Sequence, residues 1–219
     1  MIGTTNAINS IGSLPNYTYT GNHQFIDDGA AGWRIKFTSN GTLHINNYRL
    51  SIDVFLVGGG GGGSAGGGGG GYTKTYRNFI INGGVDYVIT IGAGGAGKND
   101  NGMASTGGTS SAFGYSASGG HGGDGGSGHG KGGNGGSGGG GYSGGAGGTD
   151  GSAGSKGSSY AGGAGQGTTT REFAETGATL YSSGAAGNTT YYPPANTGNG
   201  GGKNCTGASG IIIIRNARQ

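Results

Sequence analysis

Residues 119–149 read GGHGGDGGSGHGKGGNGGSGGGGYSGGAGGT, and the spacing inside this stretch decides the fold that we expect. Most residues other than glycine recur at every third position, in three runs: His121, Asp124 and Ser127; Lys131, Asn134 and Ser137; Ser143, Ala146 and Thr149. A period of three matches the polyproline II conformation, which has three residues per turn. Gly-Gly-X then leaves two edges of each helix bare and places every side chain on the third.

Bare edges allow neighbouring runs to approach closely and to exchange backbone N–H···O=C bonds, which an isolated helix of this kind cannot make internally. We therefore predict a polyglycine II (polyproline II-like) helical lattice. The alternative is a flexible glycine/serine tether, but a tether does not require a regular three-residue spacing of the residues other than glycine. A collagen helix is disfavoured because its repeat is Gly-X-Y with abundant proline, whereas this chain has 3 prolines.

The overall composition excludes several other classes. Glycine accounts for 64 of the 219 residues, and hydrophobic residues for 30%, against about 45–50% in ordinary globular proteins. Charged residues make up only 10% of the chain and the net charge is +3, too little for a clustered basic nucleic-acid footprint. Arginine is also absent from residues 92–167, so RGG-type RNA binding is not expected. Ordinary disorder is disfavoured as well, since disordered chains are usually rich in charge.

Apolar alternation predicts β-strands on both sides of the glycine field. Residues 33–37 and 43–45 alternate around Asn40-Gly41, a type I′ turn signal, so we predict a hairpin there. Residues 50–56 give a further strand. A second hairpin is predicted from residues 72–81 and 85–91, joined at residues 82–84. Residues 211–214 are four isoleucines, which suit a buried strand.

These segments predict a mainly β chain with little or no helix, because no amphipathic helical period occurs and glycine costs about 1 kcal/mol per helical position. We expect a β-structured collar built from both chain ends, with the glycine lattice as an excursion from it. The expected division is an N-terminal β-region over residues 1–57 and a glycine-rich polyglycine II domain over residues 58–219, closed by a C-terminal strand.

Two sequence features resemble catalytic or cofactor motifs but do not meet their structural requirements. Residues 92–99, GAGGAGKN, match GxGxxG and nearly match a P-loop, yet no helix start follows to present amides to a phosphate. His121, Asp124 and His129 can in principle meet around a metal, but a solvated polar face is the more common outcome. No nucleophile–base set stands out. We therefore expect no cofactor, no metal and no enzyme activity.

The lone Cys205 excludes an internal disulfide and suggests folding in a reducing cytosol. No basic stretch with a following apolar run comes after Met1, so we expect no signal peptide. The longest apolar stretches are too short to cross a bilayer, so membrane insertion is not expected either.

Three interruptions of the glycine field, residues 98–106, 168–183 and 188–197, have a different character and are candidates for contact with a partner. Tyrosine and arginine are enriched at binding hot spots, and aromatic residues without a side-chain core beneath them are expected to be exposed. The same residues can instead cap the open ends of the lattice and exclude water, and both interpretations are open at this point. The candidate receptor-binding residues are Arg171, Phe173, Tyr181, Tyr191, Tyr192 and Pro193.

The chain resembles glycine-rich domains of bacteriophage tail fibres. The resemblance lies in SIDVFLV (residues 51–57) before a glycine run, in VITIGAGG (residues 88–95) and in the closing GIIII (residues 210–214). The Gly-Gly-X field is also similar to the tip adhesins of T-even-like phages. The resemblance covers residues 48–214. It implies a sandwich of polyglycine II helices whose interruptions form receptor loops. Residues 1–47 lie outside the resemblance, and the hairpin predicted there is a candidate for mounting the domain on a fibre, which can be trimeric.

The function that the resemblance implies is host attachment by a virion tail-fibre adhesin, made in the host cytoplasm. Its partners would be a bacterial surface receptor, either a glycan or an outer-surface protein, and other tail-fibre proteins. A non-binding structural spacer or virion protein is the alternative. Ice binding ranks lower, since Asp124, Lys131 and the tyrosines spoil the flat uncharged face that it needs.

Overall fold

The computed structural model describes residues 14–46, 49–99, 102–126, 130–141 and 170–218. These residues form ten strands and two short 3₁₀ turns: β1 (Tyr17–Tyr19), β2 (His23–Asp27), η1 (Gly29–Ala31), β3 (Trp33–Phe37), β4 (Gly41–Ile45), β5 (Leu50–Val57), β6 (Thr73–Ile81), β7 (Asp86–Ile89), β8 (Ser110–Ala112), β9 (Tyr115–Ala117), η2 (Glu172–Ala174) and β10 (Ile211–Asn216). The prediction of a mainly β chain with little or no helix is confirmed.

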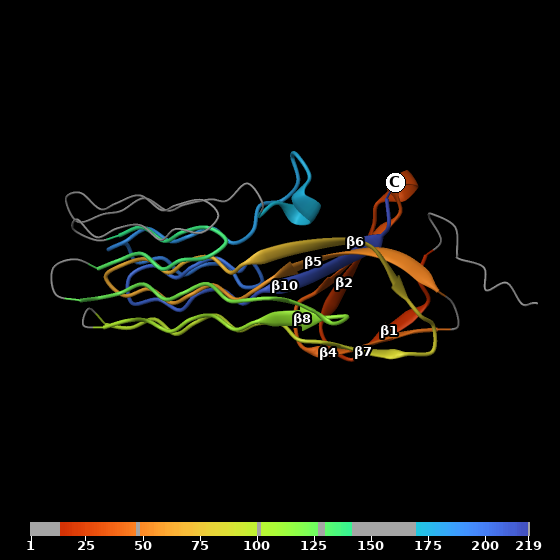
Figure 1. The fold of residues 1–219 in the computed structure, drawn as a ribbon, viewed down its shortest axis with the longest axis horizontal. Helices are drawn as coiled ribbons and strands as arrows, with labels where there is room; N and C mark the ends of the chain where they lie inside the picture. The colour runs from red at the N-terminus through yellow and green to blue at the C-terminus, as the bar shows by residue number, and fades with distance from the viewer. Residues whose placement is uncertain (1–13, 47–48, 100–101, 127–129, 142–169, 219) are drawn as a thin grey trace, which may run out of the picture.

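The larger sheet has five antiparallel strands in the order β2-β3-β10-β5-β6. The last strand of the chain therefore lies between two strands from its first 57 residues, with Ile213 opposite Lys36 on one side and Phe55 on the other (Figure 1). This arrangement confirms the collar built from both chain ends. It also places strands of the ranges 1–57 and 58–219 in one sheet, and the division into those two domains stays a prediction.

A second layer packs on one face of this sheet and consists of β1-β4-β7 and the hairpin β8-β9, which is joined to the β7 side by a bridge between Thr90 and Ser111. Alternate residues of the strands in both layers meet in one apolar cluster, because successive side chains of a strand point to opposite faces. The cluster includes Trp33, Ile35, Phe37, Leu43, Ile45, Ile52, Val54, Leu56, Ile89, Ile212 and Ile214. We call the two layers the sandwich.

Both predicted hairpins are wrong in their pairing, although their strands are present. β3 pairs with β2 and β10, whereas β4 pairs with β1 and β7, so the chain crosses from one layer to the other at Asn40-Gly41. Neither residue has the positive φ that a type I′ turn requires. Instead the Asn40 side chain accepts a hydrogen bond from the Ile91 amide (2.7 Å). β6 and β7 separate into the two layers in the same way, after the turn at Gly84.

The glycine-rich segments extend side by side from one end of the strands, and Figure 1 shows them as a bundle that continues the long axis of the sandwich. We call this part the glycine block, and residues 58–63 and 66–71 its core segments. Consecutive amides of residues 58–63 donate to three neighbouring segments in rotation. The donor–acceptor pairs are Gly58–Tyr72 and Gly61–Gly69, Gly59–Gly108 and Gly62–Ser105, and Gly60–Ala208 and Gly63–Cys205.

The carbonyl groups of the same core segment accept hydrogen bonds from three further segments. The donors are Gly120 and Gly123, Gly95 and Lys98, and Gly201. Residues 58–63 are thus surrounded on all sides by backbone, and residues 66–71 are bonded in the same rotation. An added Cβ at any glycine of the core segments would lie 1.9–2.2 Å from a backbone carbonyl oxygen. Uninterrupted glycine runs therefore occur where no side of the chain is open.

The Gly-Gly-X stretches lie further out and have one open side. His121, Lys131 and Asn134 are exposed and Asp124 is half-buried, whereas most of the glycines between them are buried. Ser137 departs from the pattern because it is fully buried. Side chains thus follow the predicted three-residue period over most of the described part of this stretch, and Ser127, His129 and residues 142–149 lie outside the described residues. The polyglycine II conformation itself stays a prediction.

Candidate functional site

A segment that returns from the glycine block covers the second face of the larger sheet. Residues 170–182, which we call the strap, contain η2 and place Phe173 and Tyr181 on Phe55 of β5, with ring centroids 5.9 and 5.7 Å apart. These three aromatic residues form a buried cluster with Val57, Ile211 and Ile213. The central strands β5 and β10 are therefore buried on both faces, by the smaller layer on one side and by the strap on the other.

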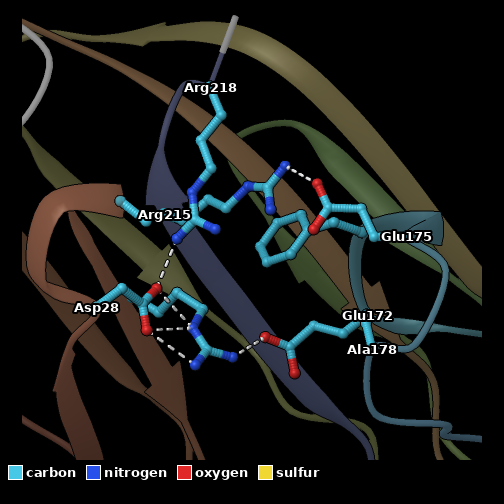
Figure 2. Close-up of a pocket in the computed structure, with 9 residues that line it drawn as sticks. Asp28, Glu172, Glu175, Ala178, Arg215 and Arg218 are labelled. Carbon is cyan, nitrogen blue, oxygen red and sulfur yellow. Dashed lines mark hydrogen bonds and ion pairs between the residues drawn. The ribbon is translucent and has the colours of Figure 1, made fainter.

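Charged side chains on this second face meet carboxylates of the strap and of the loop before β3 (Figure 2). Arg34 of β3 donates to both carboxylate oxygens of Asp28 (2.9–3.1 Å) and to Glu172 of the strap (2.6 Å). Lys36 lies 3.6 Å from the other Glu172 oxygen and donates to the Tyr181 hydroxyl (3.3 Å). Glu172 therefore connects the strap to two basic residues of one strand.

Arg215 of β10 is the most deeply buried basic residue of the cluster, at 1% exposure. Its guanidinium donates to Asp53 of β5 (3.0 Å) and to Glu175 of the strap (2.6 Å), and it lies 4.1 Å from the centroid of the Phe173 ring. Asp53, which is fully buried, also accepts from Arg77 (3.1 Å). The desolvation cost of both buried ions is thereby offset by charge-assisted hydrogen bonds and a cation–π contact.

A bulge in β6 makes room for this arrangement. The register between β5 and β6 shifts between Ile52 and Val54, so Asp53 faces two residues, Arg77 and Asn78, where a regular ladder would place one. Asn78 has a positive φ of 55°, and its amide donates to Asp53 (3.1 Å). The bulge thus aims both an amide and a guanidinium at the same buried carboxylate.

The charged side chains line a cavity of about 360 Å³ between the loop at Asp28 and the strap (Figure 2). The lining residues are Asp28, Ala31, Arg34, Glu172, Phe173, Glu175, Ala178, Arg215 and Arg218. Three arginines face three carboxylates there, each engaged in at least one ion pair, and the lining includes no serine, cysteine or histidine. These ion pairs hold the strap on the larger sheet.

The ion pairs shift the proton affinities of the groups that make them. A hydrogen bond from Arg215 lowers the pKa of Glu175. Burial alone would raise the pKa of Asp28, but hydrogen bonds from Arg34 and Arg218 outweigh it and the net pKa is lowered. Hydrogen bonding to Asp28 in turn raises the pKa of Arg34. Each of these three shifts favours the charged form of its group.

The strap holds three of the predicted receptor-binding residues, and the expectation that its aromatic residues are exposed is wrong. Phe173 is 1% and Tyr181 5% exposed. A side-chain core does lie beneath them, because Phe55 and Val57 of β5 and Ile211 and Ile213 of β10 form a second apolar cluster. Arg171 is half-buried and donates to the Ala178 carbonyl (3.1 Å) within the strap.

The other three predicted residues lie in a different place, on the outside of the glycine block. Tyr191 is 37% and Tyr192 75% exposed, and Pro193 is half-buried. They belong to residues 188–197, which we call the tyrosine loop. The structure thus separates the six predicted residues into two groups, one on the strap with buried aromatic rings and one on this loop with exposed tyrosines.

The charged cluster was missed at the sequence level, although two signals for it are present. Asp53 interrupts the apolar strand SIDVFLV and Arg215 ends the apolar run IIIIR, and a charge inside a buried strand generally needs a partner of opposite sign. Glu172 and Glu175 are visible as a carboxylate pair three residues apart. Nothing in the sequence places them on the same sheet face as Asp53 and Arg215.

Among the described residues, no group of three or more His, Cys, Asp or Glu side chains is arranged to hold a metal ion. His129, which belonged to the weighed metal set, lies outside them. The described part of the chain also contains no helical segment with the length and hydrophobicity of a membrane span.

A family model described as a glycine-rich domain matches residues 38–217. The chain belongs to this glycine-rich domain family. The match begins after β3 and runs to the end of β10, so the family unit includes the glycine block, the strap and most of the sandwich. A comparison with curated proteins finds no match.

Proposed function

We propose that this glycine-rich domain is the receptor-binding protein of a bacteriophage tail fibre, which recognises the bacterial surface through loops on its glycine scaffold. Support comes from how the scaffold is held together. Backbone hydrogen bonds between glycine segments stabilise the block without a side-chain core, so side chains of the outer segments are available at the surface. A scaffold of this kind separates stability from recognition, because surface loops can change while the backbone lattice remains.

The observation that carries the proposal is the exposure of the tyrosine loop. Tyr192, at 75%, is the most exposed of the large hydrophobic residues in the described part of the chain, and Tyr191 beside it is also exposed. Adjacent exposed tyrosines on a fixed backbone are typical of contact hot spots. The charged cavity, by contrast, has its ions paired with one another and holds the strap.

The proposed partners are a bacterial surface receptor and other tail-fibre proteins, and the proposed location is the tail fibre of the virion. The competing function is a structural spacer that binds nothing, for which the tyrosines would only cover the glycine block. Ice binding is less well supported, because exposed Lys131 and half-buried Asp124 put charges on an outer segment of the block.

Adsorption of the fluorescently labelled protein to a broad panel of bacterial strains tests the proposal. The expected result is saturable binding to some strains, competed by unlabelled protein and lost in the double variant Y191A/Y192A. Val88→Ala is the matched control, since Val88 is 69% exposed on β7 in the sandwich and away from the loop. Absence of adsorption to every strain, or equal adsorption by the double variant, would favour the spacer.

A further inference from the structure

The tyrosine loop is fixed at both of its ends and along its first half. The Asn188 amide donates to the Ala65 carbonyl (2.8 Å) at the turn between the core segments. The Lys203 amide donates to Thr189 (2.8 Å) and the Gly202 amide to Tyr191 (3.0 Å), so the loop lies along residues 202–203 of the block.

The second half of the loop is held in the same way. The Thr197 hydroxyl donates to the Pro194 carbonyl (2.7 Å), and the Asn196 amide donates to the Ser209 hydroxyl (2.9 Å). A loop held at this many points loses little conformational entropy when it binds a ligand.

Three asparagines with left-handed backbone surround the exposed tyrosines. Asn188, Asn196 and Asn204 have φ values of 50°, 59° and 59°. Asparagine adopts this conformation more readily than most residues, but it still costs free energy relative to an extended backbone. Such conformations persist where the surrounding structure imposes them, and they gather at ligand-contacting segments.

The two segments that form the surface around Tyr192 are polar and almost uncharged, and an exposed cation, Lys98, follows Gly97, which packs against the backbone of Asn204 and Cys205. Thr189, Thr190, Asn204 and Thr206 are exposed beside the tyrosines, and neither residues 188–197 nor residues 202–209 contain an acidic residue. Lys203 is the one basic residue of these two segments, and its ammonium donates to the Asn188 side chain (3.1 Å). An anionic ligand would need several cations, and a cationic ligand would need carboxylates.

A protein partner also fits this surface poorly. Stable protein interfaces bury about 800 Å² per partner and have an apolar centre. The neighbours of the two tyrosines here are threonine, asparagine, proline and alanine residues, with no Leu, Ile, Val, Phe or Met in residues 188–197 or 202–209. A sugar ring needs what is present: an aromatic face for its C–H groups, and amides and hydroxyls for its own hydroxyls.

We infer that the tyrosine loop, with Asn204 and Thr206 beside it, is a binding site for a neutral glycan, in which a sugar ring stacks on Tyr192. This inference rests on the proposed function and names the chemical class of the receptor. The backbone beside Tyr192 is held by the Gly202 amide, which donates to the Tyr191 carbonyl (3.0 Å). The ring is therefore exposed on a backbone that is fixed by hydrogen bonds.

The test uses a strain that adsorbs the full-length protein, with its cells treated in two ways before binding. Periodate oxidises vicinal diols of surface sugars, and protease removes surface proteins. The expected result is that adsorption is lost after periodate and survives protease. Adsorption that survives periodate and is lost after protease overturns the glycan site, while the proposed adhesin function remains. If no strain adsorbs the protein, the result contradicts the proposed adhesin function itself, and the glycan site falls with it.

Variants of Tyr192 test the same site with the lipid-free neutral surface polysaccharide purified from that strain. Tyr192→Ala is expected to weaken binding by about tenfold or more, because it removes the stacking face. Tyr192→Phe keeps the face and is expected to retain binding, as is Val88→Ala. Equal binding by Y192A with an unchanged circular dichroism spectrum, or loss of binding in Y192F equal to that in Y192A, overturns the stacking role.

Discussion

The glycines of this chain differ in how closely neighbouring atoms approach the position that a Cβ would occupy. At Gly67 in a core segment, an added Cβ would lie 2.1 Å from the Ala185 carbonyl oxygen, and a neighbouring backbone cannot move without breaking its own hydrogen bonds. At Gly126 the nearest atom is a carboxylate oxygen of Asp124 at 3.7 Å, and φ is not positive. The first glycine is required by packing and the second is not.

The substitution Gly67→Ala is therefore expected to lower the free energy of unfolding by about 3 kcal/mol or more, because the overlap is with backbone. Gly126→Ala is the matched control, and its effect is expected to stay within about 1 kcal/mol, since Ala only restricts the unfolded chain there. Urea titration followed by Trp33 fluorescence measures both. Equal effects of the two substitutions on the free energy of unfolding would contradict the conclusion that backbone surrounds the core segment at Gly67.

Asp53 is the residue on which the buried charges depend. Replacing it by alanine leaves Arg215, at 1% exposure, with one carboxylate fewer and leaves the Asn78 amide without its acceptor. Asp53→Ala is expected to cost about 3–5 kcal/mol in unfolding free energy. Asp86→Ala is the control, because the Asp86–His44 pair (2.6 Å) is exposed and such pairs contribute about 1 kcal/mol or less. A small effect of both substitutions would contradict the role given to Asp53.

At the scale of elements, the strap is the piece whose attachment depends most on charge. Glu172 and Glu175 join it to Arg34 of β3 and Arg215 of β10, while Phe173 and Tyr181 supply its apolar contact. The apolar contact does not change with pH, but the ion pairs require ionised carboxylates.

The free energy of unfolding is expected to decrease in acid, because the fold lowers the pKa of Glu175 and of Asp28. The ordinary values are 4.5 for Glu175 and 3.8 for Asp28, and both are lowered in the fold. Their contribution is thus fully present above these values and is lost as the pH falls through the lower pKa of each folded-state group. Unfolding midpoints at pH 7 and near pH 3 measure the loss.

Glu175→Gln isolates one part of this acid dependence. The variant is expected to be less stable than the parent at pH 7 and to lose less stability on acidification, because its amide does not titrate. Asp86→Asn serves as the control at an exposed site. An unchanged pH dependence in E175Q would show that other groups dominate acid unfolding.

For the whole molecule, the strands of the sandwich continue directly into the glycine block. β5 ends at Val57 where a core segment begins, β6 begins shortly after the other core segment ends at Gly71, and β10 follows Gly210. The Gly210 amide donates to the Gly92 carbonyl (2.8 Å) at the junction. The glycine block and the sandwich are therefore connected by continuous backbone segments, and we expect them to unfold together.

Hydrogen exchange checks this cooperation. The amides of residues 58–71 are expected to exchange as slowly as those of β5 and β10, although the core segments have no side chains to pack. In Gly67→Ala, the unfolding seen by Trp33 in the sandwich is expected to shift together with the exchange rates of the block. Fast exchange of the core segments beside a slow sandwich would show that the block is a separate unit.

Much of the architecture can be predicted from the sequence alone. The strands at residues 50–57 and 211–214, the lack of helices and the outward three-residue period follow from alternation, from β-branched residues and from glycine phase, which act over short distances. The pairing of the predicted hairpins was not readable. Asn40-Gly41 has the composition of a tight turn, but contacts with the distant Ile91 hold it in another conformation.

The candidate site depends even more on contacts between residues that are far apart in the sequence. By itself the sequence determined which segments are glycine, strand or interruption, since these depend on local conformational preference. Only the tertiary structure decided that Phe173 and Tyr181 are buried between the strap and β5 while Tyr192 is exposed, because burial depends on which distant surface covers a residue. Asp53 and Arg215 are 162 residues apart, and only the insertion of β10 beside β5 makes them partners.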